Sequence, residues 1–276
     1  TAFTYAATTY SAFMMVGLVG LAYASGIGAM IYELAYLAAT LVIIRVYGTR
    51  IWEIGRKNGY ISPMELFTDR FGKATEKTGA VVAFLALIPY TAVQVIGLAL
   101  IFEAFGIAFP TGAGIAAVII CVWAFLGGLR GVAITDSLQG IFMICVAVAV
   151  LLWSGGEFRG FEFSTFPNEV WTPVFFINLA LPWCFFALTN PQVLQRLFII
   201  KDRKGIKRMM ILFGIFGLLF TLLVTFIGFS AKAGTLGGVL PAVADRDRVI
   251  VELMSRMGGG LALILGLSII FSSVST

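Results

Sequence analysis

The stretch AVVAFLALIPYTAVQVIGLALIFEAFGIAF, residues 80 to 109, contains a single charged side chain, that of Glu103. An α-helix needs about 20 predominantly apolar residues to cross the hydrocarbon layer of a membrane. Backbone polar groups in lipid must pair internally, and a barrel strand would alternate apolar and polar residues over about ten positions, which this stretch does not do. The sequence therefore predicts an all-α membrane protein.

The composition supports this class along the whole chain. The 276 residues are 60% hydrophobic and 12% charged, with a mean hydropathy of +1.00, whereas a globular domain carries roughly a quarter charged residues. Hydropathy predicts a polytopic bundle of about eight transmembrane helices in a single domain, 1–276. The predicted spans are 2–23, 26–47, 78–106, 112–128, 132–154, 171–198, 206–231 and 247–276.

The basic residues set the orientation, because cytoplasmic loops retain lysine and arginine. If the first span runs from inside to outside, fourteen of the 19 basic residues lie inside, from Arg45 to Arg208. Five lie outside, namely Arg159, Lys232, Arg246, Arg248 and Arg256. The net charge of +5 then reports the orientation of a multi-pass protein of the plasma membrane, in contact with lipid, and no nucleic-acid partner is expected.

The sequence contains few of the residues that enzymes use for catalysis. The chain has no histidine, which excludes Ser-His catalysis and removes the commonest general base. Cys121, Cys145 and Cys184 lie inside apolar runs without a CxxC pair, so we interpret them as packing residues rather than metal ligands. No cleavable signal peptide is visible, and residue 1 begins inside an apolar helix, so we expect a fragment.

Two spans carry residues that interrupt helices, and a polar stretch separates the second span from the third. In the first span, Thr8, Thr9 and Ser11 can replace helical hydrogen bonds with their own. In the sixth, Pro182 and Asn190-Pro191 break the helical pattern. Interrupted helices in corresponding positions predict a transport site at the membrane midplane, although ordinary kinked helices in a bundle are the alternative. Within the polar stretch 48–77, Ser62-Pro63 with Glu65 predicts a short surface helix.

The stretches GGLRGVAITDSLQGIFM (127–143) and NPQVLQRLFIIKDRKGIKR (190–208) resemble the sodium:solute symporter family. Its motif Gly-Gly-x-x-x-Val/Ala-x-x-Thr-Asp-x-x-Gln is matched by Gly127, Gly128, Val132, Thr135, Asp136 and Gln139. The stretches ATTYSAFMMVGLVGLAYASG, GYISPMELFTDRF and FSSVST are also similar. The resemblance implies a leucine transporter-like inverted-repeat core with broken first and sixth helices, a first repeat of about 1–154 and an incomplete second repeat of about 171–276. It also implies sodium-coupled uptake of a small solute.

Sodium prefers oxygen ligands, and the resemblance implies where they lie. It places Na⁺ between the broken first helix and the eighth, bound by the carbonyls of Ala7, Tyr10 and Ile269 and the hydroxyls of Ser272 and Ser273. Hydrogen bonding between helices is the alternative role of such serines. That alternative is the stronger one for Ser275 and Thr276.

Five residues are candidates for solute binding. Glu33 is an ionisable residue at mid-span, where function is the default hypothesis and a structural hydrogen bond to Tyr32 or Tyr36 the alternative. Gln94 is a weaker case, Phe186 matches an aromatic gate of sugar-transporting relatives, and Ser11 and Met14 lie at the first break. The apolar residues Ala12 to Met15 favour an amino acid or a monocarboxylate over a sugar, although no arginine is placed to clamp a carboxylate.

Asp136 has two readings, a cap at the amino terminus of the fifth helix or a position on the sodium exit path. We therefore predict a sodium-coupled symporter that works by alternating access and is not an enzyme. The competing hypothesis is a transporter-like membrane sensor domain of a signalling protein.

Overall fold

The computed structural model describes residues 2–10, 14–155 and 163–275. Within these ranges every regular element is a helix and none is a strand, which confirms the all-α class. The elements of the first part are α1 (Ala2–Thr9), the π-helix η1 (Met14–Leu18), α2 (Val19–Ser25), α3 (Ile27–Ile43), the π-helix η2 (Ile44–Gly48), α4 (Thr49–Asn58), α5 (Glu65–Ala104) and α6 (Phe109–Ser154). Those of the second part are α7 (Pro173–Cys184), α8 (Phe186–Thr189), α9 (Pro191–Phe198), α10 (Arg203–Leu236), the 3₁₀-helix η3 (Arg246–Arg248), α11 (Val249–Arg256) and α12 (Gly259–Ser275).

The apolar helices follow the predicted spans. Five stretches of the described chain are long and apolar enough to cross a membrane: Ile27–Asn58, Glu65–Ala104, Phe109–Leu126, Pro173–Phe198 and Arg203–Leu236. Three shorter apolar helices, Met14–Ser25, Leu138–Ser154 and Gly259–Val274, fall in the remaining predicted spans. The chain is therefore a polytopic helical bundle.

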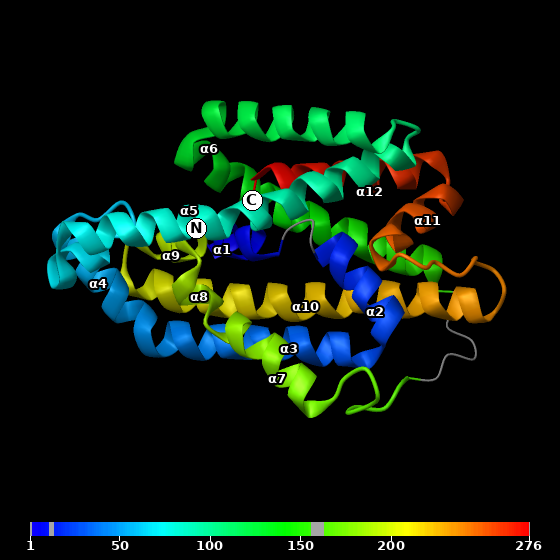
Figure 1. Ribbon diagram of the computed structural model, residues 1–276, viewed down its shortest axis with the longest axis horizontal. Helices are drawn as coiled ribbons and strands as arrows, with labels where there is room; N and C mark the ends of the chain where they lie inside the picture. The colour runs from blue at the N-terminus through cyan, green and yellow to red at the C-terminus, as the bar shows by residue number, and fades with distance from the viewer. Residues whose placement is uncertain (1, 11–13, 156–162, 276) are drawn as a thin grey trace.

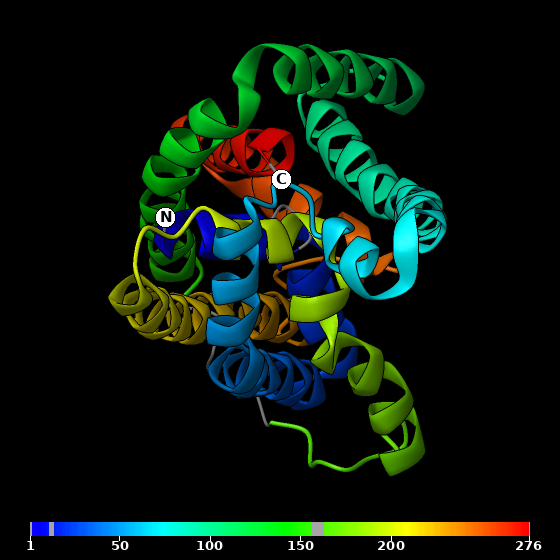
Figure 2. The same ribbon diagram turned by 90° about the vertical axis from the view of Figure 1, so that its left-hand side faces the viewer.

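The fourth and fifth predicted spans form one element. The backbone of α6 stays helical for 46 residues, through the positions around Arg130 where the sequence predicts a loop. A straight helix of that length would extend for roughly 70 Å. Instead, α6 turns back on itself, and its two arms are visible in both views (Figures 1 and 2). The two predicted spans are thus the two arms of α6.

The predicted surface helix is also joined to the span that follows. Helix α5 begins at Glu65 and continues through Gly72, whose φ of 82° and ψ of 168° are not helical. Glu65 accepts a hydrogen bond from the backbone N–H of Ile61 at 2.9 Å, and the Ser62 hydroxyl accepts one from the N–H of Met64 at 3.3 Å. Both bonds lie one residue before those of the predicted capping box. The non-helical backbone at Gly72 therefore forms a kink that separates the predicted short helix from the span that follows.

Helix α10 packs against α1, α2, α3 and α6 (Figure 1). Two of its glycines permit close contact with the first span. A Cβ on Gly217 would collide with the Tyr10 hydroxyl, and one on Gly228 would lie 2.7 Å from the Ala22 Cβ. Small residues allow helix backbones to approach closely in membranes, where no hydrophobic force drives them together. Both halves of the interrupted first span are thereby fixed against α10.

Candidate functional site

The first span is interrupted at the predicted place. Helix α1 ends at Thr9, Tyr10 forms a bend, and helical structure resumes at Met14 as the π-helix η1. The Thr9 hydroxyl donates a hydrogen bond to the Tyr5 carbonyl at 2.8 Å, as expected for a β-branched residue in the last turn. The Ala6 carbonyl accepts a hydrogen bond from the N–H of Tyr10 at 2.8 Å. Ser11 lies outside the described residues.

Tyr10 holds the interruption in place. Its ring is completely buried and lies 5.6 Å from the ring of Phe213, 5.7 Å from that of Phe216 and 6.1 Å from that of Phe220, all on α10. Aromatic pairs at such separations add to the stability given by burial alone. The backbone at the break is thus anchored by a side chain that cannot rotate into lipid.

The end of α12 presents two buried hydroxyls. Ser272 and Ser273 are 1% and 2% exposed, and both donate hydrogen bonds to the carbonyl of Ile269, at 3.0 Å and 2.9 Å. Three oxygens therefore meet on the inner face of this helix. Ser268, one turn earlier, is also completely buried and was not singled out by the sequence reasoning. The side chains of Ser275 and Thr276 lie outside the described part of the chain.

The two ends are neighbours in space. Helices α1 and α12 both pack against α6, and the carboxyl end of α12 lies beside α1 in both views (Figures 1 and 2). The structure thus brings the predicted ligands on α12 next to the helix that carries Ala7 and leads to Tyr10.

A buried ion pair joins this region to the sixth span. Asp136 on α6 lies 3.6 Å from Arg196 on α9, and their side chains are 0% and 8% exposed. The Arg196 Nε donates a hydrogen bond to the Thr8 hydroxyl at 3.2 Å. Asp136 lies inside α6, so the interpretation of this carboxylate as an amino-terminal cap is wrong. Sequence reasoning counted Arg196 only as a cytoplasmic charge, because nothing local reveals its partners.

The sixth span is interrupted twice. Helix α7 ends two residues after Pro182, and Asn190 has an extended backbone between α8 and α9. The Asn190 side-chain oxygen accepts hydrogen bonds from the N–H groups of Gln192 at 2.9 Å and Val193 at 3.2 Å. These bonds satisfy amino-terminal donors of α9 in the way expected of an asparagine N-cap. Both predicted breaks are therefore present.

Phe186 lies in an aromatic cluster at the first of these interruptions. Its ring lies 5.1 Å from that of Trp183, 5.9 Å from that of Tyr36 on α3 and 6.5 Å from that of Tyr90 on α5. The cluster therefore closes the space between three elements far apart in the sequence. A side chain in such a position can separate a central site from one side of the membrane.

The remaining candidates are buried. Met14, Glu33 and Gln94 are all buried, on η1, α3 and α5. Glu33 is close enough to the phenol groups of Tyr10, Tyr32 and Tyr36 to interact with them electrostatically. An intramembrane acid surrounded by phenols that can donate hydrogen bonds is suited to solute binding, and equally to the structural role weighed above.

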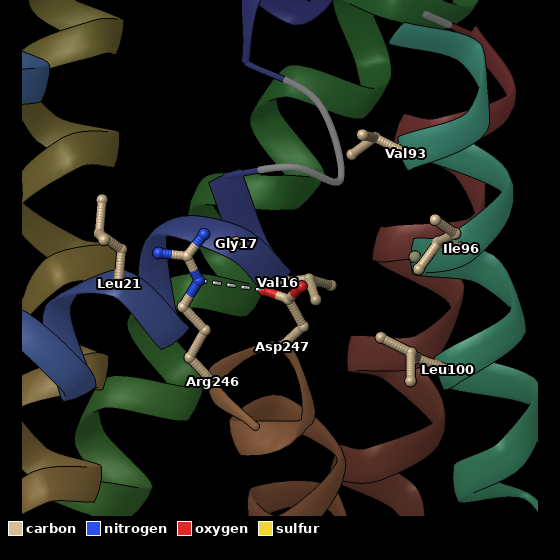
Figure 3. A pocket seen from close by; sticks show the side chains of 9 residues that line it. Val16, Gly17, Leu21, Val93, Ile96, Leu100, Arg246 and Asp247 are labelled. Atoms are coloured by element: carbon tan, nitrogen blue, oxygen red, sulfur yellow. Dashed lines mark ion pairs between the residues drawn. The ribbon is translucent and has the colours of Figure 1, made fainter. Parts of the chain in front are cut away.

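A cavity of about 200 Å³ lies beyond the first interruption (Figure 3). Its walls come from η1 and α2 on one side, through Val16 and Leu21, and from α5 on the other, through Ile96. Arg246 and Asp247 of η3 point into it from the third side, with 3.8 Å between the Arg246 Nε and the Asp247 carboxylate. The sequence placed no arginine to clamp a carboxylate, whereas the fold brings Arg246 to the lining of this cavity.

A helical bundle with two interrupted spans and a buried intramembrane acid is typical of secondary transporters. The model of the sodium:solute symporter family matches residues 1–276, and the chain belongs to this family. Sodium:solute symporters are multi-pass membrane proteins, in agreement with the apolar helices described above.

Among its relatives are two sodium/pantothenate symporters. The chain is 26% identical over 273 residues to that of Haemophilus influenzae, covering 93% of this chain and 55% of the relative. It is 24% identical over 223 residues to that of Escherichia coli, covering 75% and 46%. A monocarboxylate transport permease protein of Rhizobium johnstonii is 21% identical over 156 residues, covering 55% and 31%. The chain thus spans about half the length of the pantothenate symporters it matches.

The fold is shared with a solved structure, the substrate-bound outward-open state of a Na⁺-coupled sialic acid symporter. The TM-score is 0.80 at 18% identity, and the match covers 99% of this chain and 62% of the other. This likeness confirms the predicted leucine transporter-like fold.

Proposed function

We propose that this protein couples the entry of Na⁺ to the uptake of a small organic solute by alternating access in the plasma membrane. Membership of a symporter family supports this activity, as do relatives named for sodium/pantothenate and monocarboxylate transport. The solute we propose is a compact and partly apolar carboxylate, either a monocarboxylate or an amino acid. The proposal assigns no catalytic residue and no enzymatic step.

The observation that carries the proposal is the pair of buried hydroxyls on α12 beside the interrupted α1. Ser272 and Ser273 supply two neutral oxygens, and the Ile269 carbonyl to which both donate supplies a third. The carbonyls of Ala7 and Tyr10 complete the proposed sodium site. When Na⁺ binds, the hydroxyl protons rotate away from it, so the Ile269 carbonyl and both serine oxygens can all face the ion.

The solute site is proposed beside the ion, between the two interrupted spans. Ser11 and Met14 come from the first break, Glu33 from α3 and Gln94 from α5. Phe186, on α8, comes from the aromatic cluster described above. The partial charges of the unwound helix ends suit an anionic group, while the aromatic rings suit an apolar body.

We propose that residues of about 1–154 form a first repeat and residues of about 171–276 an incomplete second repeat of inverted topology, so that α1 and α7 are corresponding opening helices. Asp136 then lies on the cytoplasmic path of the ion, where its pairing with Arg196 ties α6 to α9. Opening this ion pair would let the carboxylate attract a departing Na⁺.

The test is uptake of radiolabelled carboxylates and amino acids under an imposed sodium gradient. Replacing Ser272→Ala together with Ser273→Ala removes two of the proposed ligands and should reduce sodium-driven uptake at least tenfold, since each lost ligand leaves an ion that has shed its water undercoordinated. Because two sites that bias one equilibrium affect each other reciprocally, solute binding in the double variant should also lose its dependence on sodium.

The matched control is Ser255→Ala on α11. Ser255 makes the same kind of hydrogen bond, from its hydroxyl to the Glu252 carbonyl at 2.8 Å, but is exposed. Its loss should leave uptake within twofold of the parent. Sodium-dependent uptake that survives in the double serine variant would refute the proposed ion site.

A further inference from the structure

The cavity between η1, α2 and α5 has a mixed lining that points to one kind of ligand. Val16, Leu21, Val93, Ile96 and Leu100 give it apolar walls, and the guanidinium of Arg246 is its cationic group (Figure 3). Asp247, whose carboxylate pairs with Arg246, also lines the cavity. A small anion with a hydrocarbon body fits this lining where it can replace Asp247 as the partner of the guanidinium.

The backbone that carries Arg246 is held firmly in position. The Arg246 carbonyl lies so close to Gly20 of α2 that a Cβ there would collide with it. Helix η3 also contacts both α2 and η1. Because the interrupted span itself supports this arginine, the distance from its backbone to the first break is fixed by direct packing.

The neighbouring arginine has a different task. Arg248 lies 2.9 Å from the Glu103 carboxylate on α5 and 3.7 Å from that of Asp245, so it ties the loop to the bundle. The ion pair described for Arg246 is with Asp247 at 3.8 Å, and their side chains are 56% and 47% exposed. Exposed pairs at such distances contribute little, so an incoming carboxylate can replace Asp247 as the partner of Arg246.

We propose that Arg246 is the residue that recognises the carboxylate of the solute on its way from the outer surface to the central site. The inference rests on the proposed function and deepens it by naming the residue that recognises the carboxylate of the solute. A guanidinium binds a carboxylate through two parallel hydrogen bonds, which a lysine cannot reproduce. The Asp247 carboxylate competes with the solute for Arg246. This competition keeps the affinity of the site low, so that the solute can leave it.

The test is equilibrium binding to the purified protein, with and without sodium, of propionate, pyruvate, pantothenate and alanine, and of the amide of whichever binds best. Arg246→Gln should raise the half-saturating concentration of the carboxylate about tenfold or more, in keeping with the loss of a charge-assisted contact, and leave that of the amide unchanged. Asp247→Asn should lower the concentration for the carboxylate about two- to fivefold, because the competing charge is gone. Arg256→Gln, on the same side but paired with Glu252 at 3.1 Å, is the control and should bind like the parent.

The results separate the two proposals. The carboxylate affinity of Arg246→Gln should fall, while sodium should strengthen binding by the same factor as in the parent protein. This outcome supports both the proposed sodium coupling and the role of Arg246. If the arginine matters but sodium has no effect in the parent, the proposed coupling fails and the role of Arg246 stands. Unchanged carboxylate affinity in Arg246→Gln, an equal loss for the amide, or the absence of any carboxylate binding in the parent overturns the inference. The opposite shift expected of Asp247→Asn distinguishes recognition from a general loss of folding.

Discussion

Arg196 is a single side chain that holds three distant segments together. It donates to Thr8 on α1 and pairs with Asp136 on α6, while its own backbone belongs to α9. A buried charge is costly unless it is paired, and removing one partner leaves the other with its full desolvation penalty. The guanidinium therefore matters for stability even where its attraction to Asp136 alone would contribute little.

We expect Arg196→Ala to lower the free energy of unfolding by about 3–5 kcal/mol, since it breaks a buried ion pair by removing its cation. The measurement is thermal or chemical unfolding of the detergent-solubilised protein. Arg208→Ala, at an exposed position on α10, should change the stability by less than about 0.5 kcal/mol.

A double-mutant cycle checks the cause. If the loss arises from the uncompensated carboxylate, Asp136→Asn combined with Arg196→Ala should be clearly more stable than the sum of the two single changes predicts. Additive losses would show that the two groups act independently.

At the scale of elements, the contact between the first span and α10 fixes the position of the backbone at the interruption of that span. Gly217 leaves room for the Tyr10 hydroxyl, and Tyr10 in turn positions the backbone that we assign to sodium. Glycine lowers helix stability relative to alanine by about 1 kcal/mol. Its presence inside α10 is therefore explained by the close approach of Tyr10.

We expect Gly217→Ala to weaken sodium binding at least fivefold and to destabilise the protein by about 1–3 kcal/mol, because the added methyl group displaces Tyr10 from a packed core. Sodium dependence of solute binding and unfolding measurements report the two effects. Gly214→Ala, one turn earlier, meets only the flexible end of Leu41 at 3.3 Å and should be close to neutral. Equal behaviour of the two variants would contradict the role given to Tyr10.

The elements also show how far sequence reasoning reaches. Apolar runs and breaking residues predicted the spans and both interruptions, because length, hydropathy and proline act locally. The continuity of α6 was missed, since a motif with two glycines and Arg130 resembles a loop, whereas the structure keeps it helical. The roles of Arg196 and Arg246 were missed for another reason. Asp136, the partner of Arg196, and the cavity walls near Arg246 lie more than fifty residues away in the sequence, and only the folded chain brings them together.

At the scale of the whole molecule, the alternation of basic residues predicts the orientation in the membrane. After replacement of Cys121, Cys145 and Cys184 by alanine, Lys57→Cys should react with a membrane-impermeant thiol reagent only from the cytoplasmic side. Ala244→Cys, in the exposed loop before η3, should react only from outside. Labelling of intact cells and of inverted vesicles measures this, and the reverse pattern would invert the proposed direction of transport.

The close contact between the Arg246 carbonyl and Gly20 links two parts that the proposed alternating access would move. Because the Arg246 carbonyl is in tight contact with α2, a tilt of α2 would move η3 in the same direction. The loop that contains η3 would then move together with the interrupted first span, and Arg246 would move with it. The same motion would expose or bury the proposed ion site.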